Sequence, residues 1–106
     1  MKLNYKSIMK DSAKIIWDEL KTGDFLFKPP YYSDADIGRY LVTEDCNSSL
    51  TIKAICFYPH KMLDVDIFRG SRVAEGIDYV KLSEKNKNKV LIEYYFNNFG
   101  TKEKIK

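Results

Sequence analysis

Two Asp-x-Asp pairs, at residues 34–36 and 64–66, come closest to a metal-binding pattern in this sequence. Asp64 and Asp66 lie two positions apart in a stretch that alternates like a β-strand, so both carboxylates should project from one face. Hard oxygen ligands of this kind suit a divalent cation. Two carboxylates are few for a metal site, and a solvated strand face is the alternative that we favour. We therefore predict no metal and no cofactor, with Asp64 and Asp66 as the first ligands to test.

The other residues with catalytic potential do not form a constellation. His60 is the single histidine and follows a proline at an expected turn, without a nucleophile close by in the sequence. The serines lack the Gly-x-Ser-x-Gly context of a nucleophile elbow, and the five glycines are scattered singly rather than grouped in a phosphate loop. The sequence therefore predicts a protein that is not an enzyme.

Aromatic and charged residues form the candidate partner-binding set. Tyr31 and Tyr32 follow two prolines in an irregular aromatic segment, and such segments often carry function. Basic residues beside tyrosines could instead hold a nucleic-acid strand by phosphate contacts and stacking, or could simply protect an exposed strand from aggregation. The candidates are Tyr31, Tyr32, Arg69, Arg72, Lys85, Lys87, Lys89, Glu93 and Tyr95.

The elements that must position these residues begin with a short strand and a helix. Residues 2–9 alternate as a strand with one half-buried face. Residues 12–22 place Ala13, Ile16, Trp17 and Leu20 at helical spacing, after N-cap oxygens at positions 11 and 12 and before a C-capping Gly23. An alternative helix begins at Ser7. Residues 24–36 read as irregular, because a Pro-Pro pair interrupts them.

The remainder of the chain reads as strands. Alternating or continuous apolar runs cover residues 37–44, 49–58, 61–68, 77–83 and 89–99, with a polar hairpin tip at residues 84–88. We therefore predict an α+β fold in which an antiparallel meander of about five to six strands packs on one N-terminal amphipathic helix. Trp17 is the expected central anchor of the core.

Composition limits the class of protein. The 106 residues suit one domain, which we place at residues 1–100, followed by a basic tail at residues 101–106. The net charge of +3 arises in residues 84–106, where six lysines face three glutamates. Two separated cysteines favour a reducing, cytoplasmic setting, and no apolar run reaches the roughly 20 residues that span a bilayer. Cys56 should be a small buried hydrophobe.

The order of elements resembles the helix-grip superfamily, which includes the start-related and polyketide-cyclase-like domains. The resembling segments are residues 3–9, the stretch Asp-Ser-Ala-Lys-Ile-Ile-Trp-Asp-Glu-Leu at 11–20, and residues 77–99. The resemblance implies an antiparallel sheet that grips an apolar ligand against a helix. Members of that family also have a long C-terminal helix, which this sequence is predicted to lack.

Three functions follow from these features. The first is a small non-enzymatic binding or inhibitory module that acts through a protein–protein surface, for example a phage or mobile-element inhibitor of a host nuclease or defence complex. The second is a helix-grip binder of a small apolar ligand. The third is a nucleic-acid-binding protein that uses the basic C-terminal surface.

Overall fold

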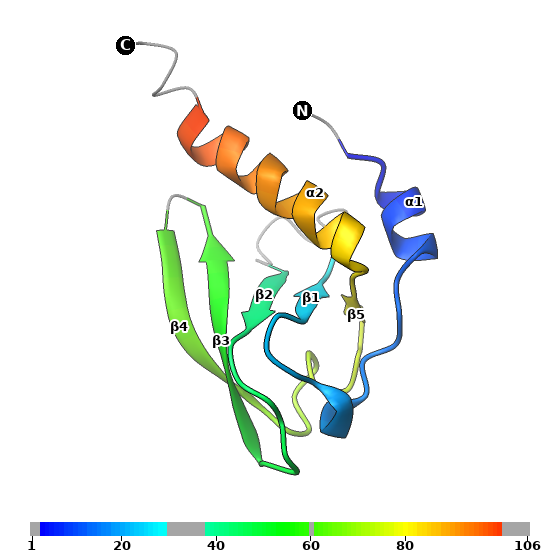
Figure 1. Cartoon of the computed structure of the whole chain (residues 1–106), viewed down its shortest axis with the longest axis vertical. Helices are drawn as coiled ribbons and strands as arrows, with labels where there is room; N and C mark the ends of the chain where they lie inside the picture. The colour runs from blue at the N-terminus through cyan, green and yellow to red at the C-terminus, as the bar shows by residue number, and fades with distance from the viewer. Residues whose placement is uncertain (1–2, 30–37, 60, 101–106) are drawn as a thin grey trace.

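A five-stranded antiparallel sheet with helices on one face forms the protein, so the predicted α+β class is confirmed (Figure 1). The computed structural model describes residues 3–29, 38–59 and 61–100. The strands are β1 (Phe25–Phe27), β2 (Arg39–Val42), β3 (Thr51–Tyr58), β4 (Lys61–Phe68) and β5 (Val80–Lys81). The helices are α1 (Tyr5–Lys10) and α2 (Glu84–Tyr95), with a one-turn 3-10 helix at Trp17–Glu19 and a π-helical turn at Phe96–Gly100.

The strand order is β4-β3-β2-β1-β5. The first four strands form an antiparallel meander, of which β2, β3 and β4 were predicted, and β5 returns to pair with β1 on its free side. Ala13 extends this edge, because it exchanges two backbone hydrogen bonds of 2.8 Å with Lys81. The β5 edge is therefore short and partly covered, whereas β4 forms the opposite edge over eight residues.

Two apolar cores lie on the two faces of the sheet. On one face, α1 and α2 pack onto β1, β3 and β5, and the buried residues are Ile8, Phe25, Phe27, Phe57, Leu82, Val90 and Tyr94. On the other face, residues 15–20 and the connection before β5 cover Leu26, Val42, Ile52, Ala54 and Ile67. Trp17 belongs to this second core, where its indole Nε1 donates a 2.8 Å hydrogen bond to the Ser49 carbonyl. The prediction that Trp17 is buried is confirmed.

The predicted C-terminal hairpin is wrong, because residues 84–95 form a helix. Ser83 caps α2, accepting a 3.3 Å hydrogen bond from the Asn86 backbone N–H. The β-branched and aromatic residues that suggested a strand repeat instead at helical spacing, so Val90 and Tyr94 face the sheet while Ile92 and Phe96 lie exposed. The chain therefore does have a C-terminal helix packed across its sheet, contrary to the prediction that it lacks one.

The N-terminal prediction is also wrong, because the segment predicted as a strand contains α1, and the segment predicted as a helix is extended apart from the 3-10 turn at Trp17–Glu19. Residues 5–10 form α1, capped by the Asn4 side chain, which accepts a hydrogen bond from Ser7 N–H at 3.1 Å. The predicted cap residues end this helix rather than start the next one, since Ser12 Oγ donates to the Met9 carbonyl. Beyond them, Ile15 and Trp17 are buried and Ile16 is exposed, which is the alternation of an extended chain.

The strands from residue 39 to residue 68 agree with the prediction, and Cys56 is buried as expected. In contrast, β1 lies inside the segment predicted to be irregular. The predicted strand 77–83 shrinks to the two residues of β5. No helix of the described residues is long and apolar enough to cross a membrane.

The helical nature of residues 84–95 predicts different responses at two neighbouring apolar positions. Val90 is fully buried and Ile92 is 47% exposed, whereas a strand would bury both. We expect Val90→Ala to lower the free energy of unfolding by about 1–2 kcal/mol and Ile92→Ala to change it by less than about 0.5 kcal/mol. Urea unfolding followed by Trp17 fluorescence measures both. Equal losses at the two positions would contradict the helix.

Candidate functional site

The long edge strand β4 is the most exposed regular element of the sheet. It pairs along its whole length with β3, from Thr51 opposite Phe68 to Tyr58 opposite Lys61. No other described strand pairs with its outer side. Met62, Leu63 and Phe68 are 56%, 42% and 58% exposed. The strand therefore presents unpaired backbone groups and apolar side chains together.

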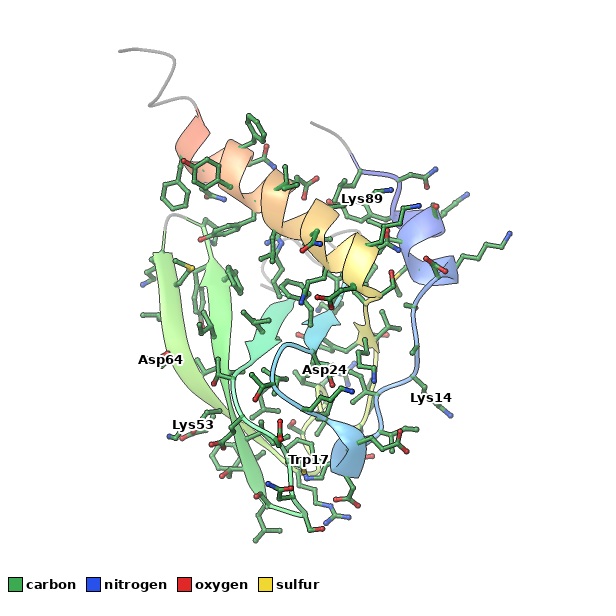
Figure 2. The ribbon with its side chains drawn as sticks, in the orientation of Figure 1. Lys14, Trp17, Asp24, Lys53, Asp64 and Lys89 are labelled. Carbon is green, nitrogen blue, oxygen red and sulfur yellow. The ribbon has the colours of Figure 1, made fainter. Side chains whose placement is uncertain are left out.

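Two depressions flank β4, one on each face of the sheet. The first has a volume of about 380 Å³ and is lined by Thr43, Lys53, Asp64 and Asp66, on the face that carries α2. Figure 2 shows Lys53 and Asp64 below the helix, on a part of the sheet that α2 leaves open. The second is smaller, about 180 Å³, and its lining is mostly apolar or aromatic but also includes Asp66 and Ser71; the other lining residues are Tyr40, Tyr58, Val65, Ile67, Phe68 and Val73. One depression is acidic and the other is mainly apolar.

The C-terminal end of α2 lies beside the turn between β3 and β4 (Figure 1). Tyr94 fixes it there, because its hydroxyl lies 2.6 Å from the Tyr58 carbonyl oxygen and 3.0 Å from that of Lys61. Tyr95 and Phe96, which follow at once, are both about half exposed. Their rings contact each other at a centroid distance of 6.4 Å. This end of the helix therefore presents two exposed aromatic rings.

The predicted basic surface is divided into separate parts. Arg72 pairs with Asp78 at 2.9 Å and Arg69 with Asp18 at 3.9 Å, in the connection between β4 and β5. Lys87 pairs with Glu84 at 2.6 Å and donates to the Gly23 carbonyl at 3.2 Å. Lys85 and Lys89 instead line a groove between α1 and α2. The predicted nucleic-acid surface is therefore not one continuous patch in this fold.

Glu93 was predicted to point outward, and this is wrong. Its side chain is buried at 5% exposure, and the Tyr5 hydroxyl lies 3.3 Å from both carboxylate oxygens. The error follows from the helix, since positions 90, 93 and 94 share its inner face. Tyr95 is exposed, as predicted for a contact residue. Tyr31 and Tyr32 lie outside the described residues.

The candidate metal ligands lie in the acidic depression. Asp66 is 3.6 Å from the Lys53 ammonium group on the neighbouring strand, and both side chains are more than half exposed. Among the described residues, no group of three or more His, Cys, Asp or Glu side chains could hold a metal ion. The arrangement is that of a solvated, partly neutralised acidic strand face.

Two tyrosines and a cysteine form a cluster beneath the apolar depression, in which Tyr79 and Cys56 are buried and Tyr40 is partly buried. Tyr40 and Tyr79 are in ring contact at 6.0 Å, and Cys56 lies opposite Tyr40 in the sheet. Burial raises the pKa of the Tyr40 phenol, and the neighbouring Tyr79 and Cys56 raise it further. Burial also raises the pKa of the Cys56 thiol and that of Tyr79. These groups therefore stay protonated at neutral pH, and the thiol is a poor nucleophile there.

Sequence reasoning did not single out Met62, Leu63 and Phe68, the exposed apolar residues of the edge strand. The alternation of residues 61–68 was visible, but it gives no information on which strand forms the edge of the sheet. One signal was available, because Asp64 and Asp66 on successive same-face positions suit an exposed strand.

Comparison of the chain with protein-family models, with curated proteins and with solved structures finds no match.

The buried tyrosines predict a loss of stability at high pH. Unfolded phenols ionise near pH 10, whereas burial keeps Tyr40 and Tyr79 protonated in the folded state. The folded state then binds more protons, so the free energy of unfolding should hold up to about pH 9 and fall above about pH 10. Denaturant unfolding at pH 8 to 11, followed by circular dichroism, measures this. Tyr40→Phe should flatten the decline, and an unchanged slope would contradict this assignment.

Proposed function

We propose that the protein is a non-enzymatic binding module that accepts a β-strand of a protein partner along the open edge of β4. The observation that carries the proposal is the eight-residue edge strand, flanked by one acidic and one apolar depression. Inhibition of a nuclease or defence complex, the role predicted from the type of sequence, is one use of such a module.

Strand addition uses both features of β4. Backbone hydrogen bonds along the edge supply affinity, and alternate side chains of the added strand reach opposite faces of the sheet. One set of these side chains would meet Asp64 and Asp66, and the other set would meet the depression lined by Tyr40, Tyr58 and Phe68. The best partner strand therefore alternates basic and apolar residues.

A second copy of the chain fits this edge poorly. Antiparallel pairing of two β4 strands that matches Met62 with Phe68, and Leu63 with Ile67, also sets Asp64 opposite Asp66. Like charges directly opposite each other destabilise a pair of strands. Charged residues of this kind commonly prevent self-association of an exposed edge. The acidic pair thus favours a partner with cations over a homodimer.

The helix-grip alternative is less well supported by the packing. The C-terminal helix that the resemblance requires is present as α2. However, Phe25, Phe27, Phe57, Val90 and Tyr94 pack together between α2 and the sheet, and all are buried. The Phe57 and Tyr94 rings meet edge to face at 5.3 Å. A tightly packed aromatic layer of this kind favours a core over a ligand cavity.

The proposal predicts binding of a synthetic extended peptide that alternates lysine and valine over eight residues. Binding should protect the β4 backbone amides from hydrogen exchange, because the added strand pairs with this edge. A peptide with glutamate in place of lysine should bind about tenfold more weakly, since it faces Asp64 and Asp66. Fluorescence anisotropy measures the affinities, and NMR-detected exchange locates the protected amides.

The double variant Asp64→Asn/Asp66→Asn is the matched control. It keeps the size of both side chains and should remove most of the preference for lysine without abolishing the binding of the peptide backbone. Protection elsewhere than β4, or an unchanged preference in the double variant, would show that the edge is not the binding site.

A further inference from the structure

A basic groove lies between α1 and the first turns of α2, away from the β4 edge. Its volume is about 380 Å³, and it is lined by Ser7, Lys10, Asp11, Lys85, Asn86 and Lys89. Figure 2 shows Lys89 on the side of α2 that faces α1. Three lysines from two separate helices therefore converge on one concave surface.

The charge of these lysines is not neutralised within the described part of the chain. No carboxylate oxygen described there lies within 4.0 Å of the ammonium groups of Lys10, Lys85 or Lys89. Four other basic residues, Lys53, Lys87, Arg69 and Arg72, each have an acidic partner. Asp11 is the one acidic residue among the six that line the groove. The local balance is thus positive, with three ammonium groups and one carboxylate.

The positions of Lys85 and Lys89 on α2 are electrostatically unfavourable for the helix. Lys85 and Lys89 are four residues apart, where like charges repel each other on one helix face. Lys85 also lies in the first turn, at the positive end of the helix dipole. Both effects raise the positive potential of the groove. An anion bound between the side chains would convert this repulsion into attraction.

We propose that this groove binds the phosphate groups of a ligand. Three ammonium groups suit a ligand with two or more negative charges, because lysine contacts phosphate as a point charge. Asn86 and Ser7, from the two walls, can donate neutral hydrogen bonds to the remaining phosphate oxygens. No described aromatic residue lines the groove, so the phosphates rather than stacked bases carry the recognition.

Titration of the full chain with inorganic pyrophosphate at low salt tests this site. NMR shift changes should gather on α1 and on residues 83–89. Lys85→Gln/Lys89→Gln should weaken binding by about tenfold, and Asp11→Asn should strengthen it by about two- to fivefold. The Asp11→Asn variant is the more diagnostic of the two, because a damaged fold would not produce a gain in affinity.

The matched control is Lys14→Gln/Lys21→Gln, which removes the same charge from exposed positions that do not line the groove. Figure 2 shows Lys14 well separated from Lys89. This variant should retain the affinity of the parent chain within about twofold. Circular dichroism melting curves of both double variants check that each one is folded.

A second titration, with a twelve-nucleotide single strand, distinguishes the source of the phosphate. Binding of pyrophosphate alone assigns the groove to a small phosphorylated ligand. Binding of the strand alone, with a steep salt dependence and loss in the Lys85/Lys89 variant, assigns it to a nucleic-acid backbone. The proposal fails if neither probe binds, or if both double variants bind equally well. None of these outcomes depends on strand addition at β4.

Discussion

Complete burial of β1 is the constraint on which the other elements of this fold depend. Phe25, Leu26 and Phe27 are all at most 1% exposed, with the two rings on one face and the leucine on the other. A strand buried on both faces needs a layer above and a layer below it. The helices supply the first layer. The extended segment around Trp17 and the connection before β5 supply the second.

The two layers that cover β1 leave the β4 edge of the sheet uncovered. The end of α2 reaches the β3–β4 hairpin, where the Tyr94 hydroxyl lies within 3.0 Å of two backbone carbonyl oxygens, but no described strand pairs with the outer side of β4. The exposure of β4 is therefore a result of how the core is covered. Asp64 and Asp66 disfavour pairing of this exposed edge with another copy of the chain. A partner strand with basic residues would pair with these carboxylates, so the charges that disfavour self-association would also select the partner.

The sequence predicted the part of the fold in which one side-chain pattern has one meaning. Burial alternates along most of β3, and apolar and acidic residues alternate along β4, so the period of two identifies these strands. The three residues of β1 are buried on both faces, so they show no alternation at all. The class and the β2–β4 part of the meander were therefore predictable, whereas β1 was not.

The helices were misassigned because composition and capping gave opposite indications. Residues 90–96 are rich in side chains that favour strands, and the tertiary burial of Val90, Glu93 and Tyr94 on one side outweighs that preference. The Ser83 cap was the local signal for α2, and it was interpreted as the last residue of a strand. The candidate site inherited this error. A hairpin tip would present positions 85, 87 and 89 together, whereas a helix separates them.

That separation gives the lysines of α2 two different roles. Successive residues on a helix are rotated by about 100°, so Lys85 and Lys89 share one face and Lys87 points to another. Lys87 is held against the Gly23 carbonyl at 3.2 Å and links the helix to the turn that enters β1. The Lys87 ammonium group therefore makes its contact within the fold. The other two charges line the α1–α2 groove together with Lys10 of α1, where like charges repel each other, and this asymmetry makes the groove a candidate site rather than a solvated helix face.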